Sequence, residues 1–329
     1  CAIEDTSWIK PGKVIREVTL TTAGGKACVD FAAASGLQYV EFDAGWYGHE
    51  YSDESDATTV SVDPKRSPGP LDLEEVIRYA ESRDIGIIVY VNRRALERQL
   101  DEILPLYRKW GIKGVKYGFV NVGSQQWTTW LHHAVRKAAE NRLMVDVHDE
   151  YRPTGYSRTY PNLMINEGGG GQEGNHPVRQ DVLLPFTRCL AGPFDYTPHL
   201  YHKGKSHAHG MAFFVVYPGP TAVVRGGVKE FAAGGPNRIG PEAEFLRRVP
   251  MNWDETRVLD AKIGRHIVTA RRRGDVWYIG GMTGDSAYTA PVALDFLAPG
   301  RRYTSTIFRD GDTETGGFRP AVKETRTVQ

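Results

Sequence analysis

The sequence is poor in cysteine, has no long apolar run and carries almost no net charge. Its three cysteines, Cys1, Cys28 and Cys189, lack the spacing of metal ligands, and an odd number argues against a disulfide framework. No segment reaches the ~18 apolar residues that cross a bilayer, so we expect no membrane insertion. The 41 basic residues balance 40 acidic ones, and no basic run with interleaved aromatic residues predicts nucleic acid as a partner.

Aromatic residues, by contrast, are plentiful, with 7 Trp, 16 Tyr and 12 Phe in 329 residues. Many should be core residues, because a chain of this length can bury one large core and has room for a second, smaller domain. Aromatic side chains near strand ends would also suit sugars, since the apolar face of a sugar ring stacks on an aromatic ring.

Strand patterns and helix patterns alternate along residues 14–252. Strands are predicted over 16–22, at the start of 37–48, over 85–92, 114–120 and 143–147, and from 163, and helices over 24–36, 70–84, 93–111, 124–142 and 240–249. This alternation predicts an α/β fold with a parallel sheet and right-handed crossovers. Too little room separates 143–147 from the strand at 163 for a full helix, which is typical of a barrel whose later loops have been remade.

The pattern changes at Asn252. Residues 253–329 consist of short β-branched and aromatic runs, separated by Gly, Asp and Pro turns every ~8–12 residues. Such a pattern predicts a small antiparallel β-sandwich domain. We therefore expect a barrel over 14–252 and a β domain over 253–329.

Acidic side chains gather between residues 144 and 173. This stretch contains Asp146, Asp149, Glu150, Glu167 and Glu173. Most of them lie just past the ends of two short apolar strands, where a barrel of parallel strands carries its catalytic residues. Carboxylates from neighbouring strand ends can form an acid/base pair or a site for a hard cation.

Seven blocks of the sequence, taken together and in order, resemble glycoside hydrolase family 97. They are TSWIKPGK, YVEFDAGWYG, GVKYGFV, RPTGYSRTYPNL, NEGGGGQE, PFTRCLAGPFDYTP and MNWDETRVLD. The resemblance implies a (β/α)8 TIM barrel with a small C-terminal β domain, activity on α-glycosides of glucose or galactose, and calcium in the active site. It also implies an N-terminal β-supersandwich, of which residues 1–13 would be a linker remnant. That domain could stand on a separate chain, and family members are expected to be periplasmic or secreted.

The resemblance assigns the catalytic residues position by position. Glu173 matches the general acid, and Asp149 matches a base carboxylate that also binds calcium. Glu167 matches a calcium ligand, and we count Glu173 as a third potential ligand of the ion. Gly118 stands where retaining members have their Asp nucleophile, and Asn92 stands where inverting members have a Glu. Only one base carboxylate therefore remains.

Four further residues are candidates for substrate binding. Trp46 follows the second strand and could stack on a sugar, although aromatic residues in such loops often pack the top of a barrel. His148 could contact a sugar hydroxyl or be a hydrogen-bonded core histidine. Lys116 should point into the barrel, where it could bind substrate or pair with Asp43. Asn92 ends the third strand.

We expect a calcium-dependent, exo-acting α-glycoside hydrolase of the inverting kind, directed to α-glucosides because of Gly118. One alternative is a retaining or α-galactoside-acting relative with another nucleophile. The other is a degenerate carbohydrate-binding module without catalysis, which Asn92 favours.

Overall fold

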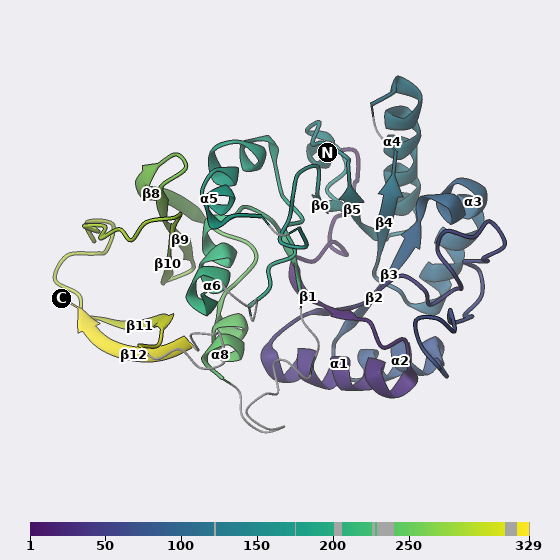
Figure 1. The fold of residues 1–329 in the computed structure, drawn as a ribbon, viewed down its shortest axis with the longest axis horizontal. Helices are drawn as coiled ribbons and strands as arrows, with labels where there is room; N and C mark the ends of the chain where they lie inside the picture. The colour runs from purple at the N-terminus through teal and green to yellow at the C-terminus, as the bar shows by residue number, and fades with distance from the viewer. Residues whose placement is uncertain are drawn as a thin grey trace.

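Seven parallel strands form one curved sheet in the order β6-β5-β4-β3-β2-β1-β7 (Figure 1). The computed structural model describes residues 1–121, 123–174, 176–200, 206–225, 228, 240–312 and 321–328. The strands of the sheet are β1 Gly12–Glu17, β2 Tyr39–Phe42, β3 Gly86–Asn92, β4 Gly114–Val120, β5 Met144–Asp149, β6 Leu163–Asn166 and β7 Thr221–Val224.

Helices connect these strands and cover the outside of the sheet. They are α1 Thr22–Ser35, α2 Leu73–Glu81, α3 Arg93–Trp110, α4 Gln125–Glu140, α5 Val178–Asp181, α6 His207–Val216 and α8 Pro241–Arg248. Side-chain oxygens of Thr21, Asp72 and Ser124 cap the first turns of α1, α2 and α4, as their position before an apolar pattern indicates. None of the helices in the described residues is long and apolar enough to cross a membrane.

The sheet closes into a barrel through the segment 194–199. The backbone of Phe194 forms a parallel β-bridge with Asn166 at the end of β6. The backbone of His199 forms another with Arg225, just past β7. This short segment occupies the remaining strand position, so the expected TIM barrel is confirmed. The first strand, however, begins at Gly12 and ends at Glu17, and the prediction of a strand over 16–22 was wrong.

The barrel interior is apolar at the bottom and charged above. A bottom layer contains Val14, Tyr39, Ile88, Met144, Met164 and Val223, against which Trp8 and Ile9 pack from the segment before β1. Side chains two residues further along each strand point the same way. In that next layer β1, β2, β4 and β5 contribute Arg16, Glu41, Lys116 and Asp146, where a TIM barrel usually has branched apolar residues.

Two antiparallel sheets follow the barrel. The first consists of β8 Glu255–Lys262, β9 His266–Arg273 and β10 Val276–Thr283, and the second of β11 Tyr303–Asp310 and β12 Ala321–Val328. Helix α6 lies between the barrel and these sheets (Figure 1). The buried Arg271 donates to the carbonyls of Val216 and Tyr217 at the end of α6, which anchors the first sheet. The predicted antiparallel β domain is confirmed.

Arg188 holds the closing segment in place. Its guanidinium donates to four backbone carbonyls, those of Asn166 (2.6 Å), Glu167 (2.8 Å), Pro193 (3.0 Å) and Gly192 (3.1 Å). We expect Arg188→Met to lower the free energy of unfolding by roughly 2–4 kcal/mol, because it leaves partly buried carbonyls without donors. Chemical denaturation measures the change. The exposed Arg78 on α2 is the control, since Arg78→Met should change stability by less than about 0.5 kcal/mol; equal effects of the two substitutions would contradict the role of Arg188.

Candidate functional site

The strands β5 and β6 bring an acidic cluster to the carboxyl end of the barrel. Asp149 is the last residue of β5, and Glu167 directly follows β6. The backbone N–H of Asp149 donates to the Glu167 carboxylate at 2.6 Å. A cleft of about 580 Å³ opens here, lined by Gly123, Asp149, Glu150, Arg152, Glu167, Gly168 and Gly169.

The backbone at Asp149 is unusual. Its φ is +70°, in the left-handed region that residues with a Cβ rarely adopt. Phe119, at the neighbouring end of β4, also has a positive φ of +52°, and its N–H donates to the Asp149 carboxylate. Strained conformations of this kind persist where the surroundings enforce them, and they cluster at functional sites. The Asp149 carboxylate is thus held by the main chain of the adjacent strand.

His148 connects the carboxylates of this site. Its Nδ1 lies 2.8 Å from Asp195 and 3.4 Å from Glu167, and its Nε2 lies 3.3 Å from Glu173. Burial and the nearby Lys116 charge would lower the pKa of His148, but the hydrogen bonds to Asp195 and Glu173 outweigh them and raise it to about 11. His148 is therefore an imidazolium at neutral pH, and both ring nitrogens donate.

Glu173 is held by two cations. One oxygen accepts from Arg16 of β1, whose guanidinium also pairs with Asp43, and the other accepts from His148. Burial would raise the pKa of Glu173, but the hydrogen bond from His148 and the charge of Arg16 lower it to about 2. A general acid needs a raised pKa. In this arrangement the carboxyl of Glu173 is ionised, so it needs a proton from a neighbouring group to act as an acid.

Lys116 lies beneath this layer and is buried. Its Nζ is 3.7 Å from Asp195, 3.9 Å from Glu41 and 4.0 Å from Asp146. Burial would lower the pKa of Lys116, but these carboxylates raise it above its usual value, so it remains charged. Lys116 has almost no surface to offer a substrate, and this differs from its expected substrate-binding role. Instead it neutralises Asp195, the partner of His148.

Two other expected substrate-binding residues lie in the core. Trp46 is fully buried, and its indole N–H donates to the Tyr90 carbonyl at 2.7 Å. Asn92 is also buried, and its side chain caps the N-terminus of α3 by accepting from the Arg94 N–H. Neither residue presents a face to a sugar, because both side chains pack where helices meet the barrel.

The ring of Tyr90 fills the space beside Gly118. A Cβ at position 118 would overlap the ring and hydroxyl of Tyr90, closer than real Cβ atoms approach another group. Tyr90 is buried and its hydroxyl lies 3.4 Å from the Asn92 amide nitrogen, so it has little room to move. Position 118 therefore has no side chain and no space for one in this packing.

Among the residues that the structure describes, His148, Asp149 and Glu167 form a group that could hold a cation. Their ligand atoms lie within 4.8 Å of one another. Hard cations such as Ca²⁺ prefer oxygen ligands, and the His148 Nδ1–H already serves Asp195. The two carboxylates thus fit a hard cation better than the imidazole does. Glu173, an expected third ligand, lies against Arg16 and His148.

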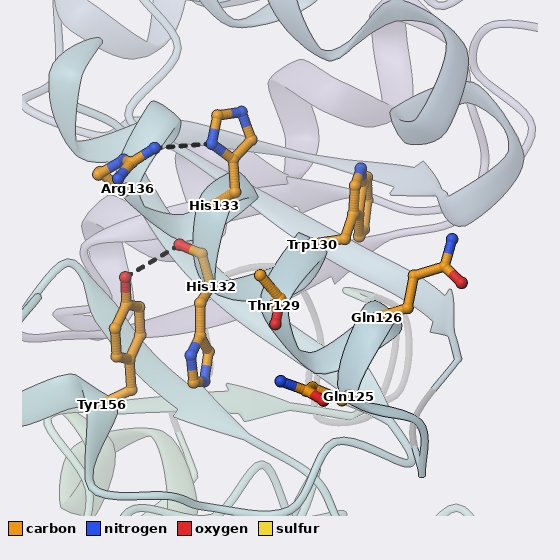
Figure 2. A pocket seen from close by; sticks show the side chains of 8 residues that line it. All are labelled: Gln125, Gln126, Thr129, Trp130, His132, His133, Arg136 and Tyr156. Atoms are coloured by element: carbon orange, nitrogen blue, oxygen red, sulfur yellow. Dashed lines mark hydrogen bonds between the residues drawn. The ribbon is translucent and has the colours of Figure 1, made fainter.

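A second cleft, of about 770 Å³, lies on the outer face of α4. Figure 2 shows its residues, with the hydroxyl of Tyr156 directed at the carbonyl of His132. It is lined by Gln125, Gln126, Thr129, Trp130, His132, His133, Arg136 and Tyr156. These residues include no carboxylate, whereas the smaller cleft at the strand ends is lined by Asp149, Glu150 and Glu167.

Arg16 and Glu41 are parts of the site that the sequence patterns did not indicate. Both are interior residues of strands β1 and β2, and they face each other in register. Because the first strand was predicted over 16–22 and not over 12–17, Arg16 was not recognised as a residue that faces the barrel interior. A charged residue that follows apolar residues within a short strand, as Arg16 follows Val14 and Ile15, is the signal that could have revealed it.

The fold and this cluster define a class: barrels of parallel strands that carry functional side chains at the carboxyl ends of the strands. Within that class the chain belongs to glycoside hydrolase family 97. The family model described as "Glycoside hydrolase 97" matches residues 8–169, and the model described as "Glycosyl-hydrolase 97 C-terminal, oligomerisation" matches residues 252–329. The resemblance seen in the sequence blocks is confirmed.

Similar proteins include two curated relatives. The "Retaining alpha-galactosidase" of Bacteroides thetaiotaomicron is 33% identical over 94% of this chain and 50% of its own length. The "Probable retaining alpha-galactosidase" of Streptomyces bingchenggensis is 34% identical over 89% of this chain and 46% of its own length. The chain spans about half the length of the curated relatives it matches.

A solved structure shows the same architecture. A glycoside hydrolase family 97 enzyme from Pseudoalteromonas sp. strain K8, in complex with acarbose, is 26% identical and superposes with a TM-score of 0.84. The match covers 99% of this chain and 58% of that enzyme.

The packing at Gly118 makes a stability prediction. Gly118→Ala should cost roughly 1–3 kcal/mol, because the new methyl group overpacks the site against Tyr90. The same substitution in a Tyr90→Ala background should cost nearly nothing, so the two changes should be strongly non-additive in urea unfolding. An equal cost of Gly118→Ala in both backgrounds would show that Tyr90 does not occupy the site.

Proposed function

We propose that this chain carries the catalytic site of an enzyme that hydrolyses α-glycosides. The observation that carries the proposal is the site itself: Asp149 and Glu173 at one end of the barrel, joined through His148 and Glu167. Two carboxylates are what glycoside hydrolysis requires, one to protonate the leaving oxygen and one to act at the anomeric carbon. The printed names of the curated relatives support the α-glycoside class.

The mechanism that the residues support best is direct attack by water. A retaining mechanism needs a carboxylate nucleophile, and position 118 has neither a side chain nor space for one. Asp149 is the strand-end carboxylate left to activate water. In this role it acts as a base, and the sugar is released with inverted configuration. The main-chain N–H of Phe119 and the left-handed turn hold that carboxylate in place.

The proton for the leaving group is shared between His148 and Glu173. In the arrangement described, the proton resides on the imidazolium of His148, whose Nε2 is 3.3 Å from Glu173. Glu173 takes this proton from Nε2 and passes it to the leaving oxygen as the glycosidic bond breaks, and the neutral His148 then regains a proton from solvent. Asp195, itself kept ionised by Lys116, compensates the charge of His148 and fixes its orientation.

The identity of the sugar is a separate question from the mechanism. Gly118 was the ground for expecting α-glucosides, whereas the names of the curated relatives favour α-galactosides. We propose that the enzyme acts on α-galactosides or α-glucosides with a neutral pyranose ring. Assays with the 4-nitrophenyl α-galactoside and α-glucoside distinguish the two.

A sugar-binding module without catalysis is the second candidate. The low pKa of Glu173 favours this candidate, because an ionised carboxylate has no proton to give to a leaving group. Burial would raise that pKa, but the hydrogen bond from His148 and the charge of Arg16 lower it. Sugar binding without any turnover would support it.

Calcium is the cation that we propose for Asp149 and Glu167. When bound, it would supply positive charge beside the carboxylate that activates water, and it would hold Glu167 ionised. Asp149 and Glu167 contribute oxygen ligands, and the cleft at the strand ends gives access.

Calcium binding should depend on pH through Glu167. Burial raises the pKa of Glu167 to about 7, so protons compete with the cation below neutral pH. Calcium should therefore raise the melting temperature more at pH 8 than at pH 5.5. At 100 times its Kd the ion would stabilise the protein by about 2.7 kcal/mol.

Variants separate this effect from general electrostatics. Glu167→Gln should abolish the calcium-induced shift. Glu41→Gln is the matched control, because burial also raises the pKa of Glu41 to about 7. This variant should retain the calcium-induced shift, since Glu41 lies in the barrel interior and is not one of the proposed ligands. A shift that survives Glu167→Gln would contradict the assignment.

The proposed acid and base predict different kinetic signatures. Glu173→Gln should reduce kcat roughly a hundred- to ten-thousand-fold on disaccharides, and much less on aryl glycosides whose leaving groups need no proton. Asp149→Asn should abolish turnover of both, with partial rescue by azide as a small external nucleophile. If Glu173→Gln slows both substrate types equally, Glu173 is not the acid. Absence of any wild-type turnover would refute the proposed function.

A further inference from the structure

Two large aromatic side chains are exposed beside the candidate base. Phe119 is 46% exposed, although phenylalanine is usually buried, and Tyr51 is 44% exposed. Their ring centroids are 5.1 Å apart, and the ring planes meet at 70°. The rings therefore form the two walls of an open corner.

The corner is attached to Asp149 through the main chain. The N–H of Phe119 donates to the Asp149 carboxylate, so the exposed ring and this hydrogen bond belong to the same residue. Positive φ values at both residues fix this arrangement. The charge of Asp149 is also among the influences that raise the pKa of Tyr51, after burial and the charge of Glu50. Tyr51 thus lies within electrostatic range of the candidate base.

The loop that carries Tyr51 is firmly held. The Tyr51 N–H donates to Nδ1 of His49 at 3.2 Å, and the Ser55 hydroxyl donates to the His49 carbonyl at 2.7 Å. The neighbouring Glu50 is buried and paired with Arg66. An exposed ring on an anchored loop is already organised for contact, which lowers the entropic cost of binding.

We propose that Phe119 and Tyr51 form an aromatic platform that binds a pyranose ring of the substrate. This inference rests on the proposed function and extends it to residues that position the sugar. A pyranose has an apolar face of C–H groups, which stacks on one ring, and an edge, which contacts the other. The platform takes the place expected of Trp46, which is buried.

The charge of the site indicates which ligand the platform accepts. Asp149, Glu150 and Glu167 line the adjacent cleft. Arg152 is the one cation among the side chains that line this cleft, so without a bound ion the three carboxylates disfavour phosphorylated or acidic ligands, which could also stack on aromatic rings. A neutral polyol meets no such repulsion, and its hydroxyls can donate to the carboxylates. A neutral sugar therefore fits the aromatic corner and the acidic cleft together.

Two substitutions remove the platform without removing the base. Phe119→Gly deletes the ring but keeps the N–H that binds Asp149, and glycine adopts the positive φ without strain. Tyr51→Ala deletes the second ring. The control is Tyr288→Ala, because Tyr288 is 45% exposed, stacks on His266 and belongs to the C-terminal region.

Binding of melibiose and maltose is measured by calorimetry in a Glu173→Gln background, so that the sugars are not consumed. We expect Phe119→Gly and Tyr51→Ala each to raise Kd for the bound disaccharide about tenfold, which corresponds to about 1.4 kcal/mol. KM of the active enzyme should rise in parallel. Tyr288→Ala should leave both unchanged, and melting temperatures confirm that each variant is folded.

The outcomes separate the platform from the proposed function. If the wild type hydrolyses the sugars and both platform variants keep its Kd and KM, the platform is overturned and the function stands. If the wild type binds without turnover and the variants weaken binding, the platform stands and the function fails. A protein that binds neither sugar overturns the platform.

Discussion

The site depends on one buried cation, Lys116, which lies among Glu41, Asp146 and Asp195 inside the barrel. A carboxylate without a partner in this interior would be protonated, because burial disfavours its charge. Burial would raise the pKa of Asp195, but the charge of Lys116 and the hydrogen bond from His148 hold it below its usual value. By contrast, burial and the charge of Asp195 raise the pKa of Asp146 well above normal. Lys116 thus keeps one carboxylate ionised while others nearby favour the protonated form.

The charged state of the other site residues follows from Lys116, along contacts that lead toward the carboxyl ends of the strands. Ionised Asp195 orients His148 and keeps it protonated, and His148 reaches Glu173. Arg16 binds Glu173 from the opposite strand and joins it to Asp43. The acid of the proposed reaction is therefore a property of this connected set, and Glu173 alone does not supply it. The base, Asp149, is held separately by backbone groups.

The sequence predicted the fold more completely than the site. Gly36 ends α1 in the left-handed conformation, with φ of +66°, as its position after the apolar pattern indicated. Parallel strands and the later antiparallel sheets followed from apolar runs and turn residues. The acidic residues of the strand ends could also be found, because strand ends converge in a barrel.

Roles that depend on packing could not be read in the same way. Trp46 and Asn92 stand at strand ends in the sequence, yet both point into the core, since local pattern does not specify the turn of the chain there. The low pKa of Glu173 could not be predicted, because Arg16, which helps to lower it, comes from a strand far away in sequence. Phe119 is exposed and has a positive φ, which no propensity for phenylalanine predicts.

The central claim is that water attacks the anomeric carbon directly, because position 118 offers no nucleophile. Proton NMR of the first product tests it most directly, by following hydrolysis of an aryl α-glycoside before mutarotation equilibrates the sugar. The account predicts that the β anomer appears first. Initial release of the α anomer would contradict it, because a double displacement requires a carboxylate that attacks the sugar, and Asp149 would then be a nucleophile and not a base.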